Sequence, residues 1–210
     1  LNAKMVNFAG WEMPIQYEGI LAETKNVRSI AGAFDVSHMG RVKITGKGSE
    51  IFLNKVTSFD PKAMSDGQAK YGLICNEGGG IIDDIILYRK THMDYLLIPN
   101  ASNTTEVLNW IRKFKYEEDL EIEDITASTT MISIQGPSSQ KALNNLIAPE
   151  PIDLKRFRST NSQYQGYDIF IGRTGYTGEN GFEIISENSI GPSIWKHLLQ
   201  LGVKPVGLGA

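Results

Sequence analysis

Apolar residues recur along the chain with two different periods, and the period separates candidate helices from candidate strands. In 18–31 they occur at helical spacing among charged residues, and Gly32 follows as a stop signal. The pattern predicts helices over 18–31, 49–56, 104–114, 138–146 and 194–201. Shorter apolar runs predict strands over 33–36, 41–45, 69–75, 81–88, 95–98, 131–134, 167–171 and 182–185. Residues 149–166 are polar and irregular, which indicates a loop and a short strand.

The order of these elements indicates the fold class. The runs 69–75 and 81–88 are separated by Asn76-Glu77-Gly78-Gly79-Gly80, and glycine supplies the positive φ that a tight reversal needs. The predicted hairpins are close-coupled and crossovers between strands are few. We therefore expect an α+β fold with antiparallel sheets and helices, not a doubly wound parallel sheet.

Composition excludes several classes of protein. The chain has 210 residues, of which 41% are hydrophobic and 21% charged, and this is typical of one large or two small globular domains. The net charge of -3 gives no reason to expect nucleic acid or a membrane surface as partner. The single Cys75 excludes an internal disulfide and is expected to be a buried thiol. His38, His92 and His197 are too far apart in sequence to suggest a zinc site.

Three segments contain residues that packing alone would not select. The first runs from Lys4 to Tyr17 and is rich in aromatic residues and methionine, without a clear period of two or 3.6. It is either an irregular arm packed over the core or the wall of a pocket.

The second segment contains Asp83 and Asp84 in an apolar run of strand character, where aspartate is disfavoured. Side chains alternate along a strand, so the two carboxylates should lie on opposite faces and cannot share a proton. Asp84 should share its face with Ile82, Ile86 and Tyr88. One aspartate should be solvated or bonded to the turn, and the other should enter an apolar environment, as an acid–base residue often does. The alternative is that both aspartates cap the glycine turn.

The third segment, 173–184, has three glycines that would let the backbone approach a ligand, or would simply form a tight loop. It lacks the Gly-Lys-Ser/Thr ending of a phosphate loop. Glu183 lies between Phe182 and Ile184 and should point away from both. A carboxylate there could accept two hydrogen bonds from the amidine-like edge of a ring, or could be an exposed strand residue.

Together these segments resemble the T-protein family of the glycine cleavage system, and the resemblance covers essentially the whole chain. Motifs similar to those of the family occur in the expected order at 4–17, 34–40, 79–84, 173–183 and 207–210. Within them stand Phe-Asp-Val-Ser-His-Met-Gly, Gly-Gly-Ile-Ile-Asp-Asp and Arg-Thr-Gly-Tyr-Thr-Gly-Glu-Asn-Gly-Phe-Glu.

The resemblance implies an aminomethyltransferase that takes the aminomethyl group from the lipoyl arm of the H-protein. It would release ammonia and form 5,10-methylenetetrahydrofolate from its co-substrate tetrahydrofolate, without a metal, a nucleic acid or a membrane. The family fold implies a discontinuous folate-binding first lobe, 1–40 with 125–210, and a second lobe, 41–124, that carries Asp84. The enzyme would be cytoplasmic in a prokaryote and in the mitochondrial matrix of a eukaryote.

The resemblance also assigns site residues. Asp84 corresponds to the catalytic aspartate of the family. Because strand alternation places Asp83 on the opposite face, replacing Asp83 is expected to leave most activity. Positions that would contact folate are Met39, Tyr71, Ile86, Tyr88, Asn100, Tyr176 and Glu183. A family arginine and a barrel lobe are expected beyond Ala210. These 210 residues alone should therefore bind folate more weakly than an extended chain, and their activity alone stays open.

Two alternatives stay within this resemblance. One is the folate module of a sarcosine or dimethylglycine oxidase, which a flavin domain upstream would identify. The other is a non-enzymatic folate-binding relative, which would be expected to lack the complete Gly-Gly-Ile-Ile-Asp-Asp segment present here.

Overall fold

The computed structural model describes residues 1–115, 119–147 and 152–210. The chain forms two compact units: residues 1–37 and 128–210 make unit 1, and 38–127 make unit 2. The predicted second lobe, 41–124, lies within unit 2. Over the described ranges, no helix is both long and apolar enough to cross a membrane.

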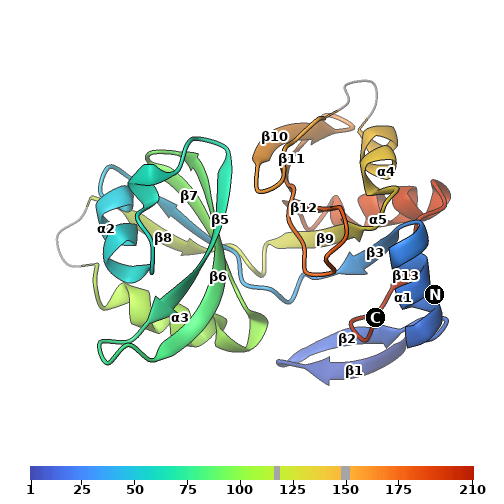
Figure 1. Cartoon of the computed structure of the whole chain (residues 1–210), viewed down its shortest axis with the longest axis horizontal. Coiled ribbons are helices and arrows are strands. Elements are labelled where there is room, and N and C mark those ends of the chain that lie inside the picture. Colours follow the sequence, from blue (N-terminus) through green and yellow to red (C-terminus); the bar gives the residue numbers. More distant parts are fainter. Residues whose placement is uncertain (116–118, 148–151) are drawn as a thin grey trace. The chain divides into compact units, whose positions relative to one another are not determined.

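Unit 1 is built on a six-stranded sheet (Figure 1). Its strands lie in the order β10 (Ser159–Tyr164), β11 (Tyr167–Gly172), β12 (Gly181–Glu187), β9 (Thr129–Gln135), β3 (Gly32–Asp35) and β13 (Lys204–Val206). Neighbouring strands are antiparallel, except for the parallel pair of β13 and β3. The helices are α1 (Ile20–Ser29), α4 (Ser139–Leu146) and α5 (Gly191–Gln200).

Side-chain alternation gives the two faces of this sheet different partners. Phe182 and Ile184 of β12 belong to the main core, which α4 and α5 complete (Figure 1). Phe34 of β3 faces the other way and packs with Val27 of α1. Glu183 lies between two core residues of β12, so it points toward the face that α1 covers in part.

The N-terminal segment forms a hairpin of β1 (Lys4–Phe8) and β2 (Trp11–Gln16). Ala9 and Gly10 make the turn with φ of 52° and 84°, as a two-residue hairpin turn requires. The expected irregular arm is therefore wrong. The hairpin is hard to recognise because β1 has no buried face, so no alternation of polar and apolar residues marks it.

Unit 2 contains a five-stranded antiparallel sheet. Its strands lie in the order β5 (Gln68–Cys75), β6 (Ile81–Thr91), β7 (Asp94–Pro99), β4 (Val42–Thr45) and β8 (Glu121–Asp124). The helices are α2 (Ser49–Val56) and α3 (Thr104–Arg112), with short 3-10 turns η1 (Pro61–Ala63) and η2 (Ala101–Asn103). Both α-helices share one apolar core with the sheet face that includes Ile85 and Leu87.

The predicted α+β architecture with antiparallel sheets is confirmed, and each predicted helix is present within a few residues. The structure adds β8 and β13, which the apolar pattern did not indicate. β8 is a polar edge strand and β13 has only three residues, one of them proline, so neither produces a periodic signal. Of the predicted irregular segment, 152–166 contains β10, and 149–151 lies outside the described residues.

Candidate functional site

The Asp84 carboxylate has polar neighbours on both sides in unit 2. Its strand β6 pairs with β5 on one side and β7 on the other. Tyr71, on β5, lies beside the Asp84 carboxylate. Asn100 directly follows β7, and its Nδ2 donates to Asp84 Oδ1 at 2.9 Å. The long-range pairing of the strands therefore brings three of the predicted site residues into direct contact.

Tyr71 is 54% exposed, so its phenol is open to solvent beside the half-buried Asp84. Partial desolvation, followed by the negative charge of the neighbouring Asp84, raises the pKa of the Tyr71 phenol. The phenol therefore stays protonated at neutral pH and can donate to the carboxylate.

Apolar residues continue the same face of β6. Ile86 and Tyr88 follow Asp84 at intervals of two and are both buried. The buried Met39 is close to Asn100 along the backbone, because the N–H of Gly40 donates to the carbonyl of Pro99 at 3.0 Å. The six predicted site residues of unit 2 thus combine a polar group around Asp84 with apolar neighbours.

Asp83 is the buried member of the aspartate pair, with 2% of its surface exposed. Its Oδ2 accepts from the backbone N–H of Asn100 at 2.8 Å. Its Oδ1 accepts from Nδ2 of Asn100 at 2.9 Å and from Nδ2 of Asn103 at 2.6 Å. The prediction of a solvated or turn-bonded aspartate does not describe Asp83. In the sequence, the partners of Asp83 could have been found only from Asn100 and Asn103, the two asparagines that follow β7.

The alternative that both aspartates cap the glycine turn is wrong. Oδ1 of Asn76 has that role and accepts from the N–H groups of Gly78 and Gly80 at 3.0 and 2.8 Å. A bulge also changes the expected alternation at the start of β6. Ile74 pairs with Asp83 and Cys75 pairs with Ile81, so Ile82 is the extra residue. Ile82 therefore packs against the core under α2 and α3 and does not share the face of Asp84.

Glu183 lies in unit 1 and is only 5% exposed, so its interpretation as an exposed strand residue is wrong. Its Oε2 accepts a hydrogen bond from the hydroxyl of Thr174. On the neighbouring strand β9, Ser133 is its partner in register. A buried carboxylate between polar neighbours is suited to bind a ligand with N–H donors.

The glycines of 173–184 make room for Gln135. A Cβ atom on Gly175 or Gly181 would come within 2.2 Å of the Gln135 side chain. Nε2 of Gln135 donates to the carbonyl of Thr174 at 3.1 Å, and its Oε1 accepts from the hydroxyl of Thr177 at 2.9 Å. The close approach that these two glycines permit is therefore internal, and Gln135 is a loop-fixing residue that the sequence did not reveal.

Tyr176, in the same loop, is 64% exposed. It lines a cavity of about 180 Å³ in unit 1 together with Arg28 and Phe34. The predicted site residues thus divide into six in unit 2, around Asp84, and two in unit 1, Tyr176 and Glu183.

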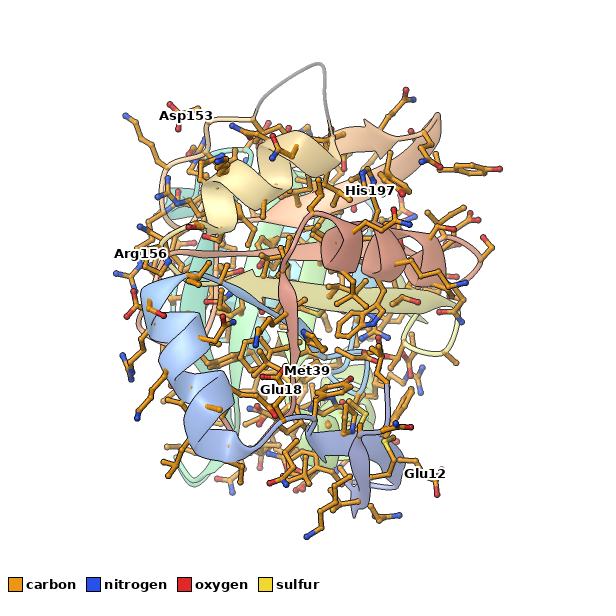
Figure 2. The ribbon with its side chains drawn as sticks, turned by 90° about the vertical axis from the view of Figure 1, so that its right-hand side faces the viewer. Glu12, Glu18, Met39, Asp153, Arg156 and His197 are labelled. Carbon is orange, nitrogen blue, oxygen red and sulfur yellow. The ribbon has the colours of Figure 1, made fainter. Side chains whose placement is uncertain are left out.

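The N-terminal hairpin lines a second cavity of unit 1, of about 450 Å³, which agrees with its interpretation as a pocket wall. Figure 2 shows Glu12, one of the lining residues, on this hairpin. Tyr17 also lines the cavity, and burial, followed by the charges of Asp35 and Glu23, raises the pKa of its phenol to about 12. None of the predicted site residues lines this cavity.

Comparisons with known proteins agree with one another. Residues 1–210 match the family described as the GCVT N-terminal domain. The chain is 40% identical over its whole length to an aminomethyltransferase of Rubrobacter xylanophilus, of which it covers 56%. It is 39% identical to an aminomethyltransferase of Thermotoga maritima, of which it covers 59%. The chain therefore spans a little more than half the length of these curated relatives.

Two solved structures resemble this one. The glycine cleavage system aminomethyltransferase T from Bartonella henselae superposes with a TM-score of 0.92 at 33% identity, over 99% of this chain and 56% of that one. A heterotetrameric sarcosine oxidase from Corynebacterium superposes with a TM-score of 0.61 over 85% of this chain and 89% of that one. Its identity is 14%, so this second likeness concerns the fold alone.

Proposed function

This chain belongs to the GCVT N-terminal domain family, and we propose that it is the folate-binding part of an aminomethyltransferase of the glycine cleavage system. The enzyme transfers the one-carbon unit from the aminomethyl-lipoyl group of the H-protein to tetrahydrofolate. Ammonia is released and 5,10-methylenetetrahydrofolate is formed. This reaction is supported by the names of relatives about 40% identical to the chain, and by that of the Bartonella protein whose fold it shares.

The observation that carries the proposal is the Asp84 carboxylate, which accepts from the Asn100 amide and lies beside the Tyr71 phenol. The amide that directly follows β7 orients this group, and the phenol on β5 is a second possible donor to it. A carboxylate held in this way can accept and return a proton at a nitrogen of the substrate. We assign Asp84 the catalytic role of orienting the co-substrate and moving protons as ammonia leaves and the carbon is captured.

The remaining residues fit the chemistry of tetrahydrofolate. Met39, Ile86 and Tyr88 are buried and would form an apolar backing for a ring system, while Tyr71 and Asn100 offer polar atoms. In unit 1, the buried Glu183 carboxylate can accept two N–H bonds from the pterin edge. We assign Tyr176 a stacking contact because its ring is exposed and borders a cavity.

Two measurements test this function. The first is calorimetric titration of tetrahydrofolate into the protein. The second is formation of methylenetetrahydrofolate from aminomethylated H-protein, with lipoyl-free H-protein as control. Binding with turnover supports the aminomethyltransferase. Binding without turnover in the full-length protein would indicate the non-enzymatic relative, and turnover of sarcosine in place of H-protein would indicate the oxidase module.

A further inference from the structure

The buried Asp83 contacts the same asparagine that holds Asp84. It accepts both the backbone N–H and the side-chain amide of Asn100. The Asn100 Nδ2 also donates to Asp84 Oδ1 at 2.9 Å and to the Asp84 carbonyl at 3.0 Å. The two neighbouring carboxylates, although they belong to opposite faces of β6, are therefore linked through one amide group.

Hydrogen-bond chemistry fixes the orientation of this amide. A carboxylate offers only acceptors, so the amide group that faces two carboxylates must present its nitrogen to them. Both N–H bonds of Asn100 are then used on Asp83 and Asp84. Its Oδ1 consequently points away from the pair and remains an acceptor.

Asp83 fixes this orientation more firmly than Asp84 can. Asp83 is buried and bonded through both oxygens, whereas Asp84 is half-buried beside the exposed Tyr71. The bond from the Asn100 backbone fixes the main chain, and the bond from its side chain fixes the rotamer. A buried, charge-assisted hydrogen bond of this kind is among the stronger ones in proteins.

We propose that Asp83 is a positioning residue. It locks the Asn100 amide so that the nitrogen orients Asp84, while the oxygen is presented as an acceptor for an N–H group of the bound co-substrate. This inference rests on the proposed function for the identity of the co-substrate. It replaces the expectation from the sequence that Asp83 could be exchanged with little loss of activity.

The test compares two variants of the full-length protein. Asp83→Asn keeps the size of the side chain but introduces a donor that faces the Asn100 amide. Asn103→Ala is the matched control, because it removes the other side-chain partner of Asp83, the 2.6 Å bond, and leaves Asn100 in place. Both variants lose a buried hydrogen bond and should melt at a lower temperature. Only Asp83→Asn should affect the ligand.

Two readouts follow the ligand and the amide separately. For Asp83→Asn we expect the Kd for tetrahydrofolate to rise about tenfold and kcat to fall by a similar factor. For Asn103→Ala we expect both values to change less than about twofold. In ¹⁵N-labelled protein without ligand, the side-chain amide hydrogens of Asn100 should exchange more slowly than those of the exposed Asn161. Their signals should shift in Asp83→Asn.

Three results would overturn the inference. One is an unchanged Kd together with unchanged Asn100 signals in Asp83→Asn. Another is a rise in Kd for Asn103→Ala as large as that for Asp83→Asn, since the role of Asp83 would then be structural only. The third result is that the side-chain amide hydrogens of wild-type Asn100 exchange as fast as those of Asn161. This measurement needs no variant, so it applies even if Asp83→Asn does not fold.

The proposed function can fail independently of this positioning. If the wild-type protein binds no tetrahydrofolate, the proposed function is contradicted, and the Asn100 signals by themselves then decide whether Asp83 holds the amide.

Discussion

At the scale of single residues, neighbours of the same chemical type have different roles because their surroundings differ. Asp83 and Asp84 are adjacent, yet the first is buried under hydrogen bonds and the second is half-buried beside an exposed phenol. Glu183 and Glu187 belong to one strand, yet only Glu183 is buried. Because the surroundings differ, each of these carboxylates can be tested against an exposed carboxylate of the same hairpin or strand.

Asp84→Asn should lower kcat by on the order of 10²–10⁴, because the amide cannot take up a proton during the reaction. The melting temperature should change little, since the new amide oxygen can still accept from Asn100. Steady-state rates with aminomethylated H-protein and thermal melts of the full-length protein measure both effects. The control is Glu77→Gln, an exposed carboxylate in the turn of the same hairpin, which should keep normal rates. A fully active Asp84→Asn would remove Asp84 from the catalytic role.

Glu183→Gln should raise the Kd for tetrahydrofolate about tenfold, because it replaces one acceptor by a donor and removes charge assistance. The fold should persist, since the remaining oxygen can accept from Thr174. Calorimetric titration measures the change, and Glu187→Gln, at the exposed end of the same strand, is the control. Equal affinities of all three proteins would leave Glu183 as a buried structural residue only.

At the scale of elements, one carboxylate ties three segments of unit 1 together. Oε1 of Glu23, in the first turn of α1, accepts from the backbone N–H groups of Tyr17, Glu18 and Gly19 at 2.7–2.8 Å. Its Oε2 accepts from Gly207, near the other end of the chain, at 2.8 Å. Burial by itself raises the pKa of Glu23, but the four N–H bonds together outweigh it, so the pKa lies below the ordinary value of 4.5.

Because the pKa of Glu23 is lower in the folded state, its stabilisation is fully present above pH 4.5 and is lost as the pH falls below that value. Glu23→Gln should lower the free energy of unfolding by about 1–3 kcal/mol at neutral pH. The difference from wild type should shrink on acidification below pH 4.5. Denaturant unfolding at several pH values measures it.

The control for this prediction is Glu18→Gln. Glu18 is exposed beside α1 (Figure 2), and its carboxylate forms a surface ion pair with Lys204 at 2.8 Å. Surface pairs contribute at most about 1 kcal/mol, so this variant should stay near wild type. If Glu23→Gln is as stable as Glu18→Gln at neutral pH, the hydrogen bonds of the Glu23 carboxylate do not stabilise unit 1 as predicted.

At the scale of the whole molecule, unit 2 is a continuous segment with its own core, inserted into the sequence of unit 1. Its ends lie side by side, because the N–H of Ile125 donates to the carbonyl of Arg41 at 2.9 Å. The guanidinium of the fully buried Arg41 also donates to the carbonyls of Met39 and Thr126. The first and last residues of unit 2 are therefore connected by hydrogen bonds.

A fragment of residues 38–127 should consequently fold by itself, with a cooperative thermal transition and near-ultraviolet circular dichroism of its buried tyrosines. In this fragment, Arg41→Met should lower the stability by about 2–3 kcal/mol, because it leaves buried carbonyls without their charged donor. Lys43→Met, two residues along the same segment and only half-buried, is the control. A fragment without a cooperative transition would contradict the independence of unit 2.

The helices, the longer strands and the fold class could be predicted from the residues alone, because apolar periodicity is a local property that each segment carries within itself. Thr104–Arg112 is an example: its apolar residues fall on one face whatever the rest of the chain does. The resemblance of five segments to one family likewise needed no coordinates, and the comparisons confirm it.

Which carboxylates are buried, and what they hold, became known only from the folded chain. Strand alternation separates Asp83 from Asp84 only by face. In the folded chain α2 and α3 cover one face of β6, and the end of β7 brings Asn100 against both aspartates. Glu183 is buried because other segments of unit 1 pack around it. Gly175 and Gly181 have no side chain and so leave space for Gln135, which is distant from both in sequence. Burial and hydrogen-bond partners depend on contacts between distant segments, and a local pattern of residues contains no information about them.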